Sequence, residues 1–503
     1  KARQGWATQP VVITAPARVA EIALDERHPL PARPEPGKMQ NWQEDWQRRG
    51  VFVPYVEVGE PIAGSVKLDG ELKNLTVRVS LFDPQGRELV REERPAAAEQ
   101  KFSFTAEPWM PMLVRVEARL LAGSDEVAHA WRFQRITQRK QGKFNTVLWS
   151  LPGDETLGPH AIARLAELGV TAGLEHTAAP INAAAHGLSY VPWSGGGGGV
   201  IAQSAEEWAQ PDHGKRFAEM VALKSRGHGV LCYSLGDEIV TQGMGKGPKT
   251  DDGFRRYLRE AHGDVAKLNA AWGTSLGSFD EVTVAAARTR QAELAKADPD
   301  NHAAAYDLFY FPGWNFIQMG KNARDWIRKA CDDPHAGIGF EGSGHVARGM
   351  CDPELVCREF DMWVPYTSIS EEFVRSIASR KFLRSSWIGY DRDATNHCSH
   401  AWRQVMMGAD SIWYWMWSTI GAWQGFQSPN LEPPEQVREL LRDTQVVREG
   451  LGDLLVASAM QHDGVAVLYS YPSIFVGGRD QRLKSYLSHW AAYLTWQMIC
   501  HVR

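Results

Sequence analysis

The sequence predicts an α/β fold: a (β/α)8 TIM barrel, preceded by a β-sandwich and followed by a partial α/β domain. After residue 138, short apolar runs alternate with segments of helical spacing, which is typical of a parallel sheet wrapped by helices. Before it, apolar residues alternate with period two. We therefore expect an extended arm and β-sandwich over 1–138, a barrel over 139–430, and the start of a Rossmann-like, trimerisation-type domain over 431–503.

The N-terminal region reads as short strands with no apparent chemistry. Residues 51–58, 75–82 and 112–120 alternate between apolar and polar side chains, and turn residues follow the second and third runs. Prolines at 29, 31, 34 and 36 predict an extended arm over the first 45 or so residues. The polar segment 138–143 is a linker.

Eight β-prone runs follow, with helical segments between them. The expected strands are 144–149, 170–176, 187–193, 230–238, 336–341, 360–366, 382–390 and 410–417. The expected helices are 160–168, 217–224, two within 252–274, and 306–330. Eight strands suit a barrel of this kind. The glycine run 195–199 lacks the pattern of a phosphate loop, and we interpret it as a mobile loop over the barrel mouth. Beyond the barrel, we expect a helix at 434–449, a strand at 464–470 and a helix at 483–498.

The composition excludes several classes of function. The net charge of −5 and the lack of a basic stripe argue against a nucleic-acid binder. No apolar run approaches the roughly 18–20 residues of a membrane helix. The six cysteines form no Cys-x-x-Cys pair, so we expect reduced thiols and no metal or cofactor. The first residues show no signal profile; the location is secreted or periplasmic if a leader has been removed, and otherwise cytoplasmic.

The run 230–238 carries the main candidate for chemistry. It is apolar until Gly236 and then presents Asp237 and Glu238. Barrel enzymes place their catalytic groups at the C-terminal ends of strands, and a half-buried acid there can hold a proton near neutral pH. The alternative is that these carboxylates cap the next helix.

Aromatic residues near strand ends indicate a carbohydrate substrate. The chain has 20 tryptophans, and the flat faces of such rings suit sugars. A tryptophan-rich core is the alternative. Because side chains alternate between the two faces of a strand, about half should point toward a substrate. The candidate substrate-binding residues are Asp237, Trp149, His176, Tyr366, Trp387, Tyr390 and Trp417.

Several segments resemble glycoside hydrolase family 42 β-galactosidases. The most specific is Leu268-Asn-Ala-Ala-Trp-Gly-Thr274, followed by Ser278-Phe-Asp-Glu-Val282; Gly408-Ala-Asp410 and Val465-Ala-Val-Leu-Tyr-Ser470 are weaker. The resemblance covers roughly residues 144–500. It implies a clan A barrel glycosidase acting on an oligo- or polysaccharide, with its acid/base glutamate ending the fourth strand, which is Glu238. That family commonly forms homotrimers, so a homo-oligomer, dimer or trimer, is implied here.

Two departures from that family leave the reaction open. The family has Asn before its acid/base, where this chain has Asp237, which could bind a sugar hydroxyl or pair with Arg384 or Arg392. The family's nucleophile ends the seventh strand, which here ends in Asp391 with no glutamate. Glu341, which ends the fifth strand, and Asp391 are therefore alternative partners of Glu238. A water activated by Glu341 would invert the anomeric carbon, and attack by Asp391 would retain it.

Two other classes of function compete with the hydrolase. One is a catalytically altered carbohydrate-binding relative of the same barrel. The other is a barrel enzyme of another class, such as a lyase or metal hydrolase, which the lack of His-x-His or His-Glu-x-x-His spacing disfavours.

Overall fold

The computed structural model describes residues 16–33, 35, 38, 49–153, 156–175, 180–193, 225–239, 248–331, 333–342, 352–366, 370–379, 381–390, 393–418, 425–459, 461, 464, 468 and 470–479. The chain divides into two compact units, one of residues 1–138 with 184–187, and one of 139–183 with 188–503. Each is described by itself.

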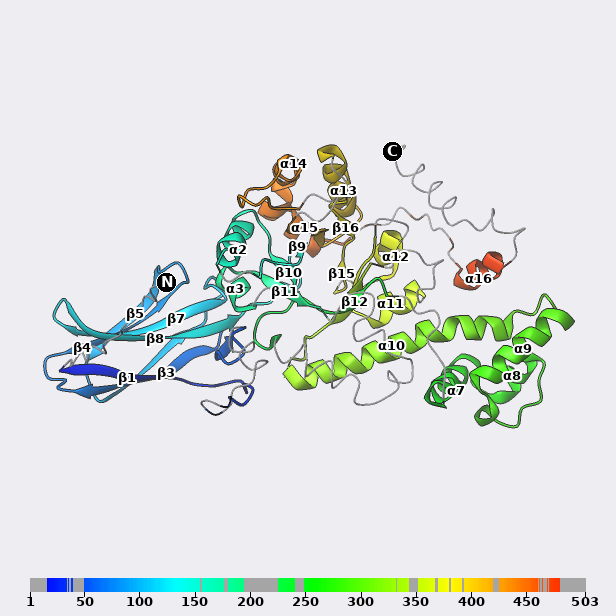
Figure 1. Cartoon of the computed structure of the whole chain (residues 1–503), viewed down its shortest axis with the longest axis horizontal. Coiled ribbons are helices and arrows are strands. Elements are labelled where there is room, and N and C mark those ends of the chain that lie inside the picture. Colours follow the sequence, from blue (N-terminus) through cyan, green and yellow to red (C-terminus); the bar gives the residue numbers. More distant parts are fainter. Residues whose placement is uncertain are drawn as a thin grey trace, which may run out of the picture. The chain divides into compact units, whose positions relative to one another are not determined.

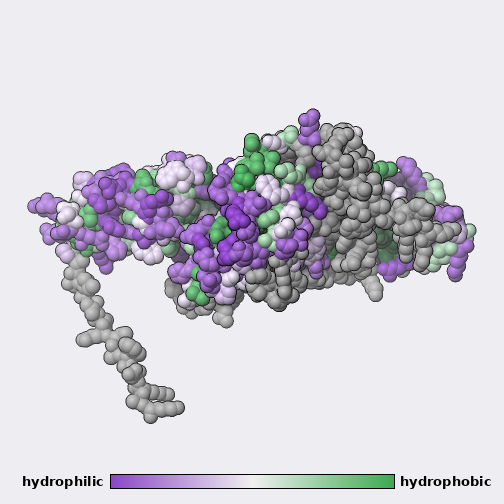
Figure 2. Space-filling model, turned by 90° about the horizontal axis from the view of Figure 1, so that it is seen from above, coloured by the Kyte–Doolittle hydropathy of each residue, from purple (hydrophilic) through white to green (hydrophobic). Residues whose placement is uncertain are grey.

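The first unit contains two sheets. One has the order β1-β3-β6 and the other β2-β8-β7-β4-β5 (Figure 1). Their bounds are β1 Ala17–Leu24, β2 Tyr55–Glu57, β3 Pro61–Gly70, β4 Thr76–Phe82, β5 Glu88–Pro95, β6 Glu99–Thr105, β7 Leu113–Ala122 and β8 Asp125–Thr137. Both sheets contribute to one apolar core, which includes Ile62 and Val66 from β3 and Val79 from β4. Because side chains alternate along each strand, the other faces are polar, and the face of this unit seen in Figure 2 is mostly hydrophilic.

Part of the segment expected to be an extended arm is a strand. Strand β1 pairs antiparallel with β3, from Ala17 opposite Gly70 to Leu24 opposite Gly64. The prolines that suggested an arm begin at Pro29, beyond the end of this strand. The apolar Ala17 and Ile22 of β1 are buried in the core. The proline-rich composition therefore described only the residues that follow the strand.

The second unit is mixed α/β, with parallel strands. One sheet has the order β11-β10-β9-β17-β16 and the other β12-β13-β14-β15, and all pairs are parallel. The bounds are β9 Asn145–Trp149, β10 Ala172–Glu175, β11 Ser189–Pro192, β12 Tyr233–Asp237, β13 Ile338–Glu341, β14 Met362–Val364, β15 Leu383–Arg384, β16 Trp387–Ile388 and β17 Ser411–Tyr414. Two isolated parallel bridges join the sheets, Trp193 with Ser234 and Tyr366 with Trp387.

Side chains on the two faces of these strands belong to different clusters. Trp149, Leu174, Trp387 and Trp413 pack together on one face. The residues between or beside them, such as Leu148, Ile388 and Tyr414, pack instead with helices. The run 382–390, expected as one strand, is broken at Ser385 and Ser386 into β15 and β16, and the Ser385 hydroxyl donates to the Ser411 carbonyl at 2.7 Å.

Helices lie between the strands of the second unit. They are α2 Gly158–Glu167, α3 Pro180–Ala185, α7 Pro248–His262, α8 Val265–Trp272, α9 Val284–Ala297, α10 Ala303–Cys331, α11 Pro353–Glu359, α12 Ser370–Ile377, α13 Ala394–Met406, α14 Glu435–Asp443, α15 Gly452–Ala457 and α16 Tyr471–Arg479. The two helices expected within 252–274 are α7 and α8. Both pack with α9 and the long helix α10 (Figure 1). None of the helices in the described ranges is long and apolar enough to cross a membrane.

A buried carboxylate joins these helices. Asp307 of α10 accepts hydrogen bonds from the Tyr257 hydroxyl at 2.9 Å and from the Trp272 ring nitrogen at 2.8 Å. Its Oδ2 also lies 3.0 Å from Nε2 of His262. Nearby, Oδ1 of Asn269 accepts from the Thr274 hydroxyl and the Leu276 amide. Most of these contacts are made by residues of the segment 254–274, so this segment has a clear packing role.

Four expected elements lie outside the described residues in whole or in large part. They are the glycine run 195–199, the helix 217–224, most of the strand 464–470, and the helix 483–498. The expected start of a third domain beyond α14 therefore remains a prediction.

Candidate active site

The carboxyl ends of β12 and β13 bring three acidic residues together. Asp237 lies opposite Glu341 in the parallel register, and the Glu238 amide donates to the Glu341 carbonyl at 3.2 Å. The backbone here is unusual, since Gly236 has a φ of 137° and Glu238 a φ of 50°. A positive φ is uncommon for a non-glycine residue and tends to occur at functional sites. The turn ends β12 at Asp237 and leaves the Glu238 side chain exposed.

Glu238 accepts a short hydrogen bond from a tyrosine. The Tyr366 hydroxyl, just after β14, donates to Oε1 of Glu238 at 2.6 Å. Burial, and next the hydrogen bond to Glu238, raise the pKa of Tyr366 well above its usual value. The hydroxyl therefore keeps its proton near neutrality and fixes the orientation of the carboxyl group. The sequence pattern predicts both residues at the site, but it gives no signal for this contact.

Glu341 lies fully buried beneath the same turn. Its Oε2 accepts from the Ser234 hydroxyl at 2.5 Å, and its Oε1 has no hydrogen-bond partner among the described residues. Burial raises the pKa of Glu341 well above its usual value, and the nearby charge of Asp237 adds to the shift. Its surroundings therefore favour the uncharged carboxylic acid over the carboxylate.

Asp237 lies between the exposed Glu238 and the buried Glu341. It is half-buried, and its Oδ1 is a buried atom with no hydrogen-bond partner among the described residues. Burial, followed by the charge of Glu238, raises the pKa of Asp237 to about 7. No ion pair joins it to Arg384, whose guanidinium instead donates to the Ser379 carbonyl. Arg392, the other expected partner, lies outside the described residues.

Because Gly342 has no side chain, the Asp237 carboxyl group can pack against it. A Cβ at this position would lie 2.7 Å from Oδ1 of Asp237 and 3.1 Å from the amide nitrogen of Glu238. Its φ of 66° is also one that glycine adopts readily. A side chain at residue 342 would therefore displace the two carboxylates.

Aromatic rings adjoin the carboxyl groups. The Tyr366 ring lies 5.9 Å from Tyr390, which stacks on Trp415 at 6.1 Å. The Trp149 ring then contacts Trp415 at 4.7 Å, Trp193 at 5.3 Å and Trp387 at 5.4 Å. Trp149 and Trp387 are almost fully buried, whereas 37% of Tyr390 is exposed. The outer members of this series can therefore reach a ligand more directly than its inner members.

Trp417, expected to be a ring platform, packs in a different place. It lies against the helix-facing cluster that contains Leu148 and Ile162, while Trp415 packs with the cluster of Trp149. Trp415 and Trp193 belong to the aromatic series, although neither was among the selected binding residues. His176 and Asp391 lie outside the described residues, so their roles stay predictions.

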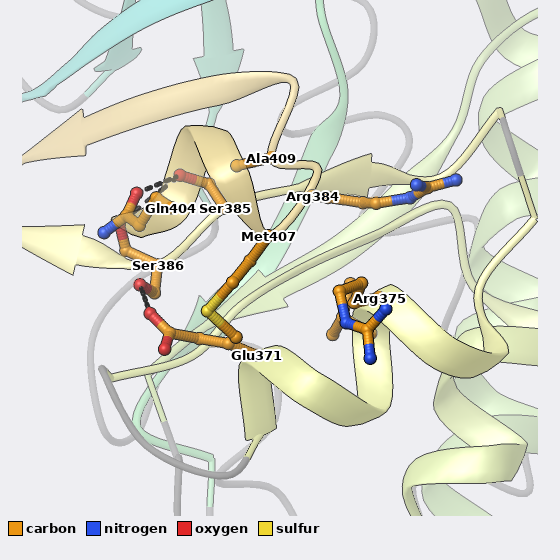
Figure 3. Close-up of a pocket in the computed structure, with 9 residues that line it drawn as sticks. Glu371, Arg375, Arg384, Ser385, Ser386, Gln404, Met407 and Ala409 are labelled. Carbon is orange, nitrogen blue, oxygen red and sulfur yellow. Dashed lines mark hydrogen bonds between the residues drawn. The ribbon is translucent and has the colours of Figure 1, made fainter. Parts of the chain in front are cut away.

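A polar pocket lies between α12, α13 and the broken strand β15–β16, apart from the candidate site (Figure 3). Glu371 accepts from the Ser386 hydroxyl and pairs with Arg403 at 3.0 Å. Arg375 pairs with Glu372 at 2.8 Å. The free volume is about 20 Å³, which is room for about one water molecule. This pocket is too small for a sugar. Glu371 and Glu372 lie in the first turn of α12, where the helix dipole stabilises acidic side chains.

No group of three or more His, Cys, Asp and Glu side chains among the described residues is arranged to hold a metal ion. The candidate site holds three neighbouring carboxyl groups, those of Asp237, Glu238 and Glu341. The pKa values of Asp237 and Glu341 are raised.

No family model matches the chain, and no curated protein matches it. Solved structures with some likeness are glycoside hydrolases at low sequence identity. A β-galactosidase from the psychrophilic Marinomonas ef1 is 13% identical over 62% of this chain and 62% of its own, with a TM-score of 0.45. A β-glucuronidase from Bifidobacterium dentium is 10% identical over 85% and 67%, with a TM-score of 0.38.

The catalytic domain of a β-amylase from Paenibacillus polymyxa is 13% identical over 60% of this chain and 97% of its own, also with a TM-score of 0.38. The chain thus spans about three fifths of the β-galactosidase. Likenesses at these TM-scores do not indicate the function of this chain.

Proposed function

We propose that this chain is a glycoside hydrolase with Glu238 as its general acid and base. The observation that carries the proposal is the exposed Glu238 carboxyl at the end of a parallel strand, oriented by the Tyr366 hydroxyl at 2.6 Å. The resemblance of Leu268–Thr274 to β-galactosidases supports it. We propose further that strands β9 to β17, counting the broken strand β15–β16 as one, form a closed barrel of eight strands. The two bridges between the two parallel sheets would close it.

In the proposed reaction, Glu238 donates its proton to the glycosidic oxygen as the bond to the anomeric carbon breaks. A second carboxylate must then stabilise or attack that carbon, and water finally supplies the hydroxyl of the free sugar. In the retaining route Glu238 takes the proton of that water, which restores the acid; in the inverting route the second carboxylate takes it. The rings of Tyr390 and Trp415 offer apolar faces to the sugar beside it.

The second carboxylate is the open element of this proposal. Glu341 is fully buried, and burial raises its pKa well above the usual value, which disfavours the ionised form that a base or a nucleophile needs. This favours Asp391, which the sequence places after strand β16, as the residue that acts on the anomeric carbon. Glu341 remains the alternative if binding of substrate opens a path to it and removes its proton.

The first experiment measures turnover of Glu238→Gln. The purified chain is assayed on 4-nitrophenyl glycosides of galactose, glucose and glucuronic acid and on β-linked disaccharides. The variant should fold normally by circular dichroism and lose 10³-fold or more of kcat/KM on disaccharides. It should lose less on nitrophenyl glycosides, whose leaving groups need little protonation. The exposed Glu260→Gln on α7 is the matched control, and equal losses in both variants would reject the proposal.

Two variants then separate the candidate partners. Asp391→Asn should abolish turnover, whereas Glu341→Gln should keep a measurable part of it. NMR of the first sugar released reports retention if Asp391 attacks and inversion if a water does. The reverse pattern, loss with Glu341→Gln alone, would assign the second carboxylate to Glu341.

A carbohydrate-binding protein without turnover is the second candidate. The burial of Glu341 favours it, because of the three acidic residues at the candidate site, Asp237, Glu238 and Glu341, only Glu238 is then exposed. Saturable binding of a disaccharide, with no product after prolonged incubation of the wild-type chain, would support this candidate over hydrolysis.

A further inference from the structure

An exposed tryptophan lies on the outer face of the larger sheet of the first unit. Trp131 of β8 is 43% exposed, and it pairs with Glu117 of β7. Val116 and Ala118, the neighbours of Glu117 on β7, pack in the core. Because side chains alternate along a strand, Glu117 and Trp131 lie on the face away from that core. The edge of the Phe133 ring contacts Trp131 at 4.9 Å and supports the exposed indole from the same strand.

The side chains beside Trp131 form a planar array that is fixed by its own contacts. Glu117 is buried, and its two oxygens bind Arg115 at 3.0 Å and the Nε of Arg119. The guanidinium groups of Arg115 and Arg119 lie over the Phe82 ring of β4, at 5.0 and 5.6 Å from its centre. Side chains held in this way lose little conformational freedom when a ligand binds, which lowers the cost of binding.

A histidine lies one residue pair along the sheet from Trp131. His129 pairs with Arg119, and its side chain is 53% exposed. Its Nδ1 lies 2.7 Å from Oε1 of Glu126, which orients the ring. The Nε2 atom is on the opposite side of the ring, where it can exchange a hydrogen bond with a ligand hydroxyl. The face therefore combines an aromatic platform with an adjacent polar group.

The charges on this face suit a neutral ligand. Arg115 and Arg119 pair with Glu117, and Arg119 also lies 3.5 Å from Glu126. A phosphate backbone needs cations that are not already neutralised, and the core of a stable protein interface is depleted in charged residues. A saccharide meets neither difficulty. The apolar C–H face of a pyranose ring packs on an indole, and its hydroxyl groups bond to polar groups at the edge of the ring.

We propose that this outer face, centred on Trp131, is a binding site for a neutral polysaccharide chain, separate from the site of Glu238. It lies wholly within the first unit, on strands β4, β7 and β8 (Figure 1). The proposal does not depend on turnover at Glu238, because the residues that carry it are all in that unit.

Electrophoresis in native gels that contain a soluble polysaccharide tests the proposal. The gels contain a galactan, a mixed-linkage β-glucan or a galactomannan, and the chain carries Glu238→Gln so that the polymer is not consumed. The chain should be retarded in at least one of these gels. Adding Trp131→Ala should weaken that retardation by about tenfold or more. Trp109→Ala is the matched control, because Trp109 is 60% exposed on the loop between β6 and β7 and should not affect retardation.

Two further variants keep the test decisive if Trp131→Ala destabilises the sheet, which thermal denaturation detects. Trp131→Tyr keeps a smaller ring and should retain part of the retardation, and His129→Ala should weaken it severalfold. Retardation in none of the gels, or retardation that is unchanged in Trp131→Ala and in His129→Ala, overturns the proposal. Equal losses in Trp131→Ala and Trp109→Ala overturn it as well.

Turnover separates this proposal from the proposed function. Trp131→Ala in the wild-type chain should keep kcat/KM on 4-nitrophenyl glycosides, which are too short to use a second site. Retardation that requires Trp131, in a wild-type chain that hydrolyses no glycoside, would confirm the binding face and reject hydrolysis at Glu238. Hydrolysis without retardation would have the opposite meaning.

Discussion

Two regions of the second unit each bury an acidic side chain, and the two side chains differ in how many hydrogen-bond donors surround them. Asp307 in the helical region is surrounded by a tyrosine hydroxyl, a tryptophan ring nitrogen and a histidine ring nitrogen. Glu341 at the strand ends has one hydroxyl partner, and one of its oxygens has none among the described residues. The donors around Asp307 fill its hydrogen-bonding capacity, whereas burial with few donors raises the pKa of Glu341. Asp307 therefore joins helices, while Glu341 belongs to a group whose protonation can change.

The largest expected effect is that of Asp307→Ala on the free energy of unfolding. Asp307→Ala leaves up to three buried groups without their acceptor, at about 1 kcal/mol or more each, so the free energy of unfolding should fall by about 3–5 kcal/mol. Urea denaturation followed by circular dichroism measures it. Asp307→Asn, which keeps one acceptor oxygen, should cost less. A midpoint unchanged in Asp307→Ala would show that these bonds do not stabilise the helices.

Tyr366→Phe tests the orientation of Glu238. A hydrogen bond to a charged group contributes about 1.5–3 kcal/mol, so kcat/KM should fall about 10- to 100-fold while the fold is kept. Tyr310→Phe is the control, because it removes a bond between the Tyr310 hydroxyl and Asp352 at 3.1 Å in the helical region. That variant should leave kcat/KM close to the wild-type value. Equal losses in the two variants would argue against a special role for Tyr366.

Asp410→Asn tests whether an acidic side chain outside the proposed site makes the stability of the folded chain depend on pH. Burial raises the pKa of Asp410 to about 7, although it accepts from the Arg384 amide at 2.9 Å. A raised carboxyl pKa means that the folded state binds the proton more tightly. Its stabilising contribution is therefore complete below about pH 4 and is lost as the pH rises to 7.

Asp410→Asn removes that dependence. The Tm of the variant relative to the wild type should rise by the equivalent of about 1–2 kcal/mol between pH 5 and pH 8. Thermal denaturation at several pH values measures the difference. A relative Tm that falls over this range would mean that ionised Asp410 is stabilised by its surroundings.

The smallest expected effect is that of Glu341→Gln on stability. Glutamine has the same shape, carries no charge, and can still accept from Ser234. The free energy of unfolding at pH 6 should therefore change by less than about 1 kcal/mol. A loss of several kcal/mol would indicate that Glu341 is ionised in the folded chain and bound by groups outside the described residues.

Much of the strand order could be predicted from the sequence, because buried parallel strands are short apolar runs between helices. The position of Glu238 at the end of such a run followed from the same pattern. The strand β1 was missed because the prolines after residue 28 dominate the composition of the N-terminal segment. At the break between β15 and β16 the Ser385 hydroxyl donates a hydrogen bond to the Ser411 carbonyl. The spacing of apolar residues in the sequence gives no sign of such a bond.

Side-chain positions at the site were harder to predict than strands. Strand alternation places Trp413 in the cluster of Trp149, but β17 ends at Tyr414, so alternation no longer applied at Trp417, which packs with the other cluster. The bond between Tyr366 and Glu238 joins residues 128 positions apart, and its geometry depends on the positive φ of Glu238. Contacts of this kind depend on tertiary structure and have no local sequence signal.

The segment Leu268–Thr274, which resembles β-galactosidases most specifically, makes contacts of a structural kind. Asn269 fixes the following loop, Trp272 donates to Asp307, and Gly273 ends α8 with a φ of 62°. Selection for folding alone would preserve such residues, whatever happens at Asp237 and Glu238. The likeness of this segment to β-galactosidases is therefore explained by its packing role, and it does not report which reaction takes place at Asp237 and Glu238.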